Sequence, residues 1–377
     1  MKNKKRNLLG KIGILSTILF VLTACDSAND KTTNSTSNLG NSNGAEIAMV
    51  ADGGSIDDQG FNQGTWQGIK KYAEEFDISH KYYQPVEKTT DDYLSAIDLA
   101  IEGGAKIIVT PGFRFKEPIF IAQEVHPDVK FVLLDGVPTN QNSEVMITEN
   151  TVGVEYAEEQ SGFLAGYAAV KDGNKKLGFM GGVAVPAVIR YGYGFIQGAQ
   201  EAAKELNLSD VEISYYYTGT FDATPETQTL AATWYQNGIE VIFACGSGVG
   251  QSVMAAAEAA SPEGKTIGVD IDWSDESETV LTSAVKSIDS SVYQMLEKFY
   301  TDEFPGGENV IMNATNDGVE LPMSVSRFTK FTQEDYDNVY AKLADGEFKP
   351  KGNIDKSGQT INLDSISDGT VKVTEVK

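Results

Sequence analysis

The sequence predicts an α/β protein built from two doubly wound lobes with a cleft between them. From Ala45 onward, short apolar runs alternate with longer amphipathic stretches. Apolar runs separated by helices indicate parallel sheets that are covered on both faces. The pattern of 46–135 starts again over 176–270, and a chain of this length exceeds what one hydrophobic core accommodates. We therefore expect two similar lobes.

Strands are expected at the short apolar runs and helices at the amphipathic stretches between them, because strand and helix differ in length and in apolar spacing. The expected strands cover 46–50, 105–110, 130–134, 176–180, 212–217, 240–244 and 266–270. The expected helices cover roughly 62–76, 90–103, 116–125, 155–171, 190–206, 225–237, 248–260, 288–302 and 332–344.

The first residues predict export through a signal peptide over 1–24. Basic residues within 1–7 precede an apolar run over 12–23, which ends in small residues. This run is shorter than the ~20 residues that a transmembrane helix needs. Its end, Leu22-Thr-Ala-Cys25, resembles the bacterial lipobox. The resemblance implies that Cys25 receives a lipid and becomes the new N-terminus.

Residues 25–44 are expected to form a lipidated, flexible tether. They are polar and contain almost nothing that could enter a core, and such stretches behave as flexible coils. The expected location is thus the extracytoplasmic face of the cell membrane, with the membrane contacted through the lipid anchor. The other cysteine, Cys245, lies in an apolar run and is expected to be a small buried core residue.

The net charge argues against two classes of partner. The formal charge is −24, and loss of a leader with five basic and no acidic residues makes it −29. Nucleic acids and anionic lipid surfaces both attract proteins through cationic patches. We therefore expect no nucleic-acid partner and no electrostatic adhesion to lipid. A monomer is expected, since a tethered binding protein works as a single copy, and no cofactor is expected.

Polar and glycine residues follow several of the expected strands. In doubly wound sheets, ligands bind beyond the carboxyl ends of the strands. Five such exits occur, and two of them carry a phenylalanine; they begin at Asp52, Asp135, Gly219, Gly246 and Asp270. Phe61, in the first exit, is expected to point into the cleft. Its alternative role is apolar packing at the start of the following helix.

The chain resembles the basic membrane protein family, the purine-nucleoside-binding lipoproteins of ABC importers. The signature is Asp52-Gly-Gly-Ser-Ile-Asp-Asp-Gln-Gly-Phe-Asn-Gln-Gly-Thr-Trp-Gln-Gly68. Further blocks in family order include Glu159-Gln-Ser-Gly-Phe-Leu-Ala-Gly-Tyr-Ala168, Gly192-Tyr-Gly-Phe-Ile-Gln-Gly-Ala199 and Thr282-Ser-Ala-Val-Lys286. Together the blocks extend from about 46 to 345. No single block is specific, but the ordered set is.

The resemblance implies a type I periplasmic-binding-protein fold, in which a three-crossing hinge joins two Rossmann-like lobes. On this basis the N-terminal lobe is expected over 45–150 plus about 273–308. The C-terminal lobe is expected over about 151–272 plus 309–377. The implied function is capture of a purine nucleoside, of guanosine, inosine or adenosine type, and its delivery to an ABC permease.

The resemblance also implies roles for individual residues. Phe61 and Phe221 would enclose the purine from opposite lobes, which is physically reasonable because aromatic stacking on a base contributes about 1–3 kcal/mol. Asp135 would accept hydrogen bonds from N–H groups of the base. The other implied ligand contacts are polar side chains for base edges and ribose hydroxyls, and backbone made accessible by glycine: Asp52, Asn62, Asp270 and Lys286, and Gly246 and Gly248.

The sequence leaves two alternative functions. A nucleoside hydrolase-like enzyme would use an aspartate cluster to hold calcium, and Asp52 with Asp57-Asp58 is similar to part of one. However, calcium needs six to eight oxygen ligands, and no nucleophile elbow, metal-spaced histidine pair or P-loop occurs in the sequence. We therefore expect no enzymatic activity. The remaining alternative is the same fold binding a sugar or a signalling molecule.

Overall fold

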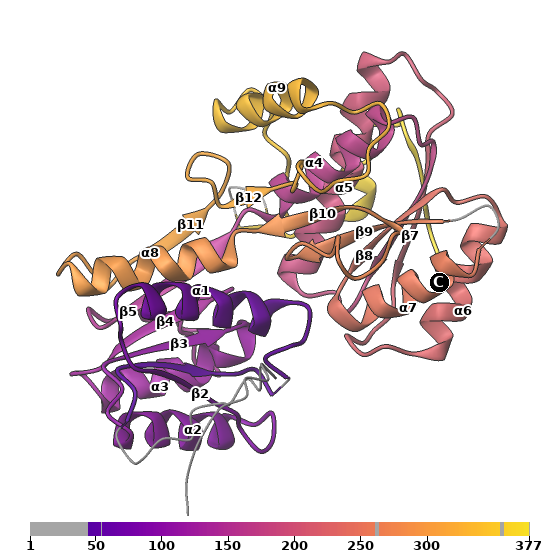
Figure 1. Cartoon of the computed structure of the whole chain (residues 1–377). Helices are drawn as coiled ribbons and strands as arrows, with labels where there is room; N and C mark the ends of the chain where they lie inside the picture. The colour runs from indigo at the N-terminus through magenta and orange to yellow at the C-terminus, as the bar shows by residue number, and fades with distance from the viewer. Residues whose placement is uncertain (1–43, 54, 261–263, 355–357, 377) are drawn as a thin grey trace, which may run out of the picture. The chain divides into compact units, whose positions relative to one another are not determined.

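The computed structural model describes residues 44–53, 55–260, 264–354 and 358–376. The predicted leader, the lipidation of Cys25 and the tether up to residue 43 lie outside the described residues. The described chain contains two β-sheets of six and seven strands with helices packed around them (Figure 1). No helix in these ranges is both long and apolar enough to cross a membrane.

The first sheet is parallel throughout and carries β4 and β3 at its centre. Its strands in spatial order are β11 (Asn309–Met312), β5 (Thr151–Tyr156), β4 (Lys130–Leu134), β3 (Ile107–Pro111), β1 (Ile47–Val50) and β2 (His80–Tyr83).

The second sheet repeats this arrangement, and only β12 runs antiparallel to its neighbour. Its strands in spatial order are β12 (Val319–Glu320), β10 (Val280–Lys286), β9 (Lys265–Asp270), β8 (Val241–Cys245), β6 (Lys176–Gly181), β7 (Glu212–Tyr217) and β13 (Lys372–Glu375).

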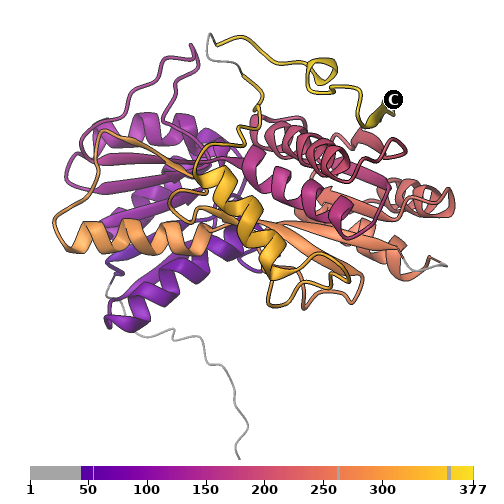
Figure 2. The ribbon, with the colours of Figure 1, turned by 90° about the horizontal axis from the view of Figure 1, so that it is seen from above.

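The α-helices connect these strands and cover the sheets (Figure 2). They are α1 (Phe61–Glu75), α2 (Thr90–Glu102), α3 (Lys116–Val125), α4 (Glu158–Lys171), α5 (Pro186–Glu205), α6 (Pro225–Gln236), α7 (Ser247–Glu258), α8 (Ile288–Tyr300) and α9 (Gln333–Ala344). These positions confirm the nine expected helices to within a few residues. The largest shifts are at α4, whose expected first residues belong to β5, and at α5, which begins earlier because Pro186 occupies its first turn.

The four inner strands of the first sheet, β1, β3, β4 and β5, have side chains buried on both faces. Ile47 and Met49 of β1 belong to a core that includes side chains of α1 and α8, whereas Ala48 and Val50 face a second core with α2 and α3. This alternation is the two-residue period of a β-strand. It explains why the strands appear in the sequence as continuous apolar runs.

The chain passes between the two sheets three times, as the family fold implies. The crossings follow β5, β10 and β11. The predicted lobe boundaries were wrong at these three strands: β5 and β11 pair within the first sheet, and β10 pairs within the second. The predicted boundaries fell before β5 and between β9 and β10, where the chain continues in the same sheet.

Helices α4 and α5 approach each other closely enough for backbone contact. A methyl group on Gly162 or Gly166 of α4 would lie 2.1 or 2.0 Å from a carbonyl oxygen of α5. Methyl groups on Gly194 and Gly198 of α5 would lie 2.1 and 2.0 Å from carbonyl oxygens of α4. These four glycines belong to the two family blocks that the sequence shows in this region. Their lack of a side chain sets the separation of the two helices.

We expect Gly166→Ala to destabilise the protein by about 1–3 kcal/mol, because the added methyl group overlaps the Phe195 carbonyl oxygen. Helix propensity alone would change the stability in the opposite direction, by about 0.5–1 kcal/mol. Urea unfolding measures the difference. Gly352→Ala is the control, since its methyl group meets no atom closer than 3.4 Å. A stabilised Gly166→Ala variant would contradict the close approach of α4 and α5.

Candidate functional site

A cavity of about 260 Å³ is lined by residues from both sheets. Its walls are formed by loops that follow the carboxyl ends of strands and by the first turns of the helices after them. The lining residues that the sequence analysis selected are Asp52, Phe61, Asn62, Asp135, Phe221, Gly246, Asp270 and Lys286. The structure thus brings together eight of the selected positions.

Gly248, which was expected to give a ligand access to the backbone, is not among the residues that line this cavity. Its backbone N–H donates to the Phe221 carbonyl oxygen at 3.1 Å, so it is not available to a ligand. A side chain at this position would meet the Phe221 oxygen and the Ala223 nitrogen at 2.4 Å. Gly248 therefore acts by letting the loop that carries Phe221 pack against α7.

The sheet topology explains where the cavity lies. In the first sheet, β2 lies on one side of β1 and β3 on the other, so the direction of strand addition reverses at β1. In the second sheet, β7 and β8 flank β6 in the same way. Such reversal points open a crevice at the carboxyl ends of the strands. Asp52 and Gly112 follow the two strands of the first reversal point, and Gly246 follows β8 at the second.

In the first lobe, Asp52 and Asn62 are held by a hydrogen-bond network. The two oxygens of Asp52 accept from the Tyr93 hydroxyl at 2.6 Å and from Arg114 Nη1 at 2.9 Å. The Asp52 N–H donates to Asn62 Oδ1 at 2.9 Å. Burial, the largest influence, raises the pKa of Asp52, while Tyr93 and Arg114 oppose this shift.

Asp58 caps the first turn of α1 and so fixes the start of the helix that carries Phe61. Its Oδ1 accepts from the backbone N–H groups of Gly60 and Gln63 at 2.9 and 3.1 Å. Its Oδ2 accepts from the side-chain amide of Asn62 at 3.0 Å. These bonds satisfy exposed N–H groups at the helix start. They also occupy the Asp58 carboxylate, which a nucleoside hydrolase-like enzyme would need as a calcium ligand.

The two phenylalanines come from different lobes. Phe61 begins α1, and its ring packs edge-on to Tyr156 with centroids 6.4 Å apart. Phe221 lies in the loop after β7, where its ring packs over the backbone of Gly182 and Gly246. A methyl group on Gly182 would lie 2.5 Å from that ring. Both rings are partly exposed and line the same cavity.

Lys286 is the cation at the centre of the site, and it is 2% exposed. Its Nζ lies 3.0 Å from both oxygens of Asp135, 3.0 Å from Glu158 Oε1 and 3.7 Å from Asp270 Oδ1. It also lies 4.9 Å from the centre of the Phe61 ring. Since Asp135 belongs to the first lobe and Lys286 ends β10 of the second, this ion pair links the two lobes.

Behind Lys286, a second cation completes the charge cluster. Arg190 of α5 pairs with the fully buried Glu158 and lies 3.8 Å from Glu159 Oε2. The close packing of α4 and α5 brings these side chains together. The cluster therefore contains four carboxylates, Asp135, Glu158, Glu159 and Asp270, and two cations.

Because the carboxylates outnumber the cations in this cluster, some of their pKa values are raised and one is lowered. Burial raises the pKa of Asp135 to about 7 against the attraction of Lys286, and burial also raises that of Asp270. Burial and the neighbouring Glu158 raise the pKa of Glu159 to about 7. For Glu158, burial is outweighed by Lys286 and Arg190, which lower its pKa to about 2. Strongly perturbed groups in a cavity are typical of functional sites.

Asp135 and Asp270 occupy equivalent places in the two lobes. Asp135 directly follows β4, and Asp270 ends β9. Both adopt the left-handed backbone conformation, with φ of 63° and 68°. Non-glycine residues rarely adopt this conformation, and its strain concentrates at binding sites. The repeated geometry turns both carboxylates toward Lys286.

Several site residues escaped the sequence analysis. Lys88 and Arg114 line the cavity after β2 and β3, two strand exits that were not considered. Glu158 begins α4 just after β5, a strand that the sequence did not predict, and Arg190 lies on α5 away from any strand exit, so the strand-exit rule identifies neither residue. Tyr191 also lines the cavity, and its hydroxyl group donates a hydrogen bond to Asp270 Oδ1 at 3.3 Å. Arg114 follows β3, whose apolar run was predicted, whereas Lys88 follows β2, an edge strand that was not predicted from the sequence.

We expect Lys286→Met to lower the free energy of unfolding at pH 7.5 by about 3–5 kcal/mol, because it leaves buried carboxylates without their cation. The loss should shrink at pH 5.5. A carboxyl group with a raised pKa in the folded state contributes stability at low pH and loses it as the pH rises through that pKa. Urea unfolding at both pH values measures this. Lys204→Met, which removes an exposed pair with Asp368, should cost under about 1 kcal/mol. Equal losses in the two variants would contradict a central role for Lys286.

The two sheets, the three crossings and the cavity define a ligand-binding protein of the type I periplasmic-binding-protein fold. A solved ABC transporter solute-binding protein from Aeropyrum pernix K1 has the same fold, with a TM-score of 0.69. The match covers 82% of this chain and 94% of that one at 22% identity, so it carries the fold alone.

The chain belongs to the Bmp family, whose model, described as ABC transporter substrate-binding protein PnrA-like, matches residues 45–349. It is 27% identical to the ABC transporter nucleoside-binding protein BmpA of Lactococcus lactis, over 82% of this chain and 86% of that protein. It is 28% identical to basic membrane protein D of Borreliella burgdorferi, over 89% and 91% of the two chains. Membership implies a ligand, a membrane permease as partner and an extracytoplasmic place of action.

Proposed function

We propose that this protein is the purine-nucleoside receptor of an ABC importer. The observation that carries the proposal is one cavity lined by a phenylalanine from each lobe together with Asp135 and Lys286. Flat aromatic rings suit a flat base. Buried carboxylates suit the N–H groups of a purine and the hydroxyl groups of a ribose. The nucleoside-binding name of the Lactococcus lactis relative agrees with this ligand class.

In this proposal, each side chain has a defined role. Phe61 and Phe221 stack on the base from opposite lobes. Asp135 accepts hydrogen bonds from the base, since each of its oxygens keeps a lone pair beyond the one that faces Lys286. The polar groups around the rings, Asp52, Asn62, Asp270 and Lys286, bind the remaining base edge and the ribose.

Contacts from both lobes couple binding to closure of the cleft. A ligand shifts an equilibrium between two conformations by its differential affinity for them. A ligand held by Phe61 on one side and Phe221 on the other favours the conformation that brings both rings onto the base. The loaded protein then delivers the nucleoside to the permease without chemical conversion.

The proposal includes a lipid anchor at Cys25. Its support is the sequence Leu22-Thr-Ala-Cys25 after a basic and then apolar segment. Two acyl chains hold a protein at a membrane stably, whereas one gives marginal binding. Labelling of cells with a radioactive fatty acid tests this: wild-type protein should carry the label and Cys25→Ala should not.

Isothermal titration of the refolded, ligand-stripped protein tests the function. The panel contains adenosine, guanosine, inosine, cytidine, uridine, free purines and several sugars. Tight binding of purine nucleosides, with no product formed on chromatography, is the expected result. Binding of a sugar with no response to any nucleoside would overturn the proposal.

We expect Phe61→Ala and Phe221→Ala each to weaken purine-nucleoside binding about 5- to 150-fold, which corresponds to loss of about 1–3 kcal/mol of stacking. Phe61→Tyr should retain most of the affinity. Phe76→Ala is the control, because this exposed ring lies outside the cavity lining. Unchanged affinity in both cavity variants, measured by the same titration, would remove the stacking model.

Binding should also weaken at low pH, because protonated Asp135 loses its charge and one acceptor site. With a pKa of about 7, the ionised fraction of Asp135 falls about tenfold between pH 8 and pH 6, and the affinity should fall in proportion. Glu159, whose pKa is also about 7, requires a control. Glu159→Gln should keep the pH dependence and Asp135→Asn should flatten it. The reverse pattern would assign the titration to Glu159.

A further inference from the structure

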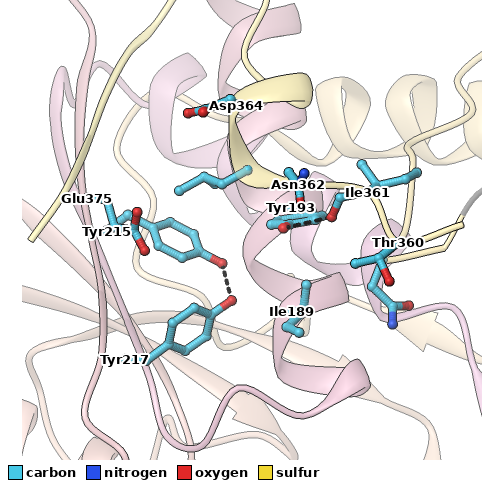
Figure 3. A pocket seen from close by; sticks show the side chains of 11 residues that line it. Ile189, Tyr193, Tyr215, Tyr217, Thr360, Ile361, Asn362, Asp364 and Glu375 are labelled. Atoms are coloured by element: carbon cyan, nitrogen blue, oxygen red, sulfur yellow. Dashed lines mark hydrogen bonds between the residues drawn. The ribbon is translucent and has the colours of Figure 1, made fainter. Parts of the chain in front are cut away.

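A second cavity of about 330 Å³ lies between the Tyr-rich strand β7, helix α5 and the C-terminal segment (Figure 3). It shares no lining residue with the first cavity. Its inner wall is formed by Tyr215 and Tyr217 of β7 and by Ile189 and Tyr193 of α5.

The outer wall comes from the last part of the chain, beyond residue 349, where the family match ends. Strand β13 extends the second sheet by pairing with β7, which brings Glu375 beside Tyr215. Two glutamines of α5 hold the segment in place. Gln197 exchanges two hydrogen bonds with the backbone of Lys351, at 2.9 and 2.8 Å. Gln200 bonds to the backbone of Ile366 and Asp368, at 3.2 and 2.7 Å.

Within the cavity, the three tyrosines are fixed by hydrogen bonds. The hydroxyl groups of Tyr215 and Tyr217 point toward each other at 2.8 Å, and the Tyr193 hydroxyl donates to the Ile361 carbonyl oxygen at 3.1 Å (Figure 3). Tyr215 also stacks on Phe179 of the core, with centroids 4.6 Å apart. The rings are therefore held in place before any ligand arrives.

The charged residues that line the second cavity are all acidic. Asp364 and Glu375 contribute carboxylates, and the other lining residues are aromatic, aliphatic, amide or hydroxyl side chains. Within the described part of the chain, no lysine, arginine or histidine pairs with either carboxylate. Burial raises the pKa of Tyr193 and Tyr217, and the charge of Glu375 adds to both shifts, so its negative potential reaches the phenol groups.

We propose that this second cavity, enclosed by the C-terminal segment, binds a small organic cation such as a quaternary ammonium or a primary amine. The faces of tyrosine rings attract cations through their quadrupole. Asp364 and Glu375 provide the opposite charge, and the aliphatic side chains accommodate the apolar part of the ligand. The proposal is independent of what the first cavity binds.

Isothermal titration of the purified protein with choline, putrescine and spermidine at low ionic strength tests the proposal. Glucose and succinate serve as neutral and anionic probes. At least one cation should bind and the other two probes should not. Asp364→Asn with Glu375→Gln should weaken that binding at least about tenfold, because exposed charged partners each contribute a few-fold. Both side chains are exposed, so the fold should be retained.

The matched control is Glu124→Gln with Asp128→Asn, which changes the net charge equally at exposed positions outside the cavity. This control should bind the cation as the wild type does. Tyr217→Leu should weaken binding about two- to fivefold, whereas Tyr217→Phe keeps the ring face and should retain it. Silence toward all three cations, binding of glucose instead, or equal weakening in the two charge variants would overturn the proposal.

Discussion

The Lys286 ammonium group is the interaction on which the cleft depends. It lies almost fully buried among Asp135, Glu158 and Asp270, and close contact with those carboxylates keeps it charged there. Removing a charge from water costs several kcal/mol, which good geometry must offset. Because its partners belong to both lobes, the same contact that satisfies the charge also sets the position of one lobe against the other. The binding site and the hinge are therefore one electrostatic unit.

Backbone packing between α4 and α5 makes this arrangement possible. The glycines of α4 and α5 allow the helices to approach until Arg190 reaches Glu158 and Glu159. Arg190 then neutralises part of the charge that Lys286 alone could not. A larger side chain at Gly166 would separate the helices and weaken this support. The four glycines of these helices thus act on the site indirectly, through the distance between two cations and four carboxylates.

The sequence predicted seven of the strands, the helices and most of the cleft residues, but it missed β5 and β10, which lie between two neighbours in their sheets. Buried parallel strands are apolar on both faces, so β1, β3, β4, β6, β8 and β9 stand out as continuous runs. Edge strands do not: β2 reads His80-Lys-Tyr-Tyr83 and β13 is largely exposed. The strand-exit rule found Asp52, Asp135 and Asp270 because the carboxyl ends of parallel strands share one edge. Glu158 and Arg190 came from helices, where no local pattern distinguishes a buried charge from a solvated one. Lys286 was selected through the family resemblance.

The composition of the cluster indicates what kind of ligand it favours. A site built only for stability would balance its charges, yet four carboxylates here share two cations, and both Asp135 and Asp270 adopt a strained backbone conformation. Natural proteins depart from such rules mainly at functional sites. The surplus consists of hydrogen-bond acceptors facing a cavity with aromatic walls. A ligand that is flat and donates several N–H or O–H groups supplies what the protein lacks, and it does so without bringing a net charge into the cleft. A nucleoside has these properties, whereas an anion would add to the excess negative charge, and a flat ring without donors would leave the acceptors unsatisfied.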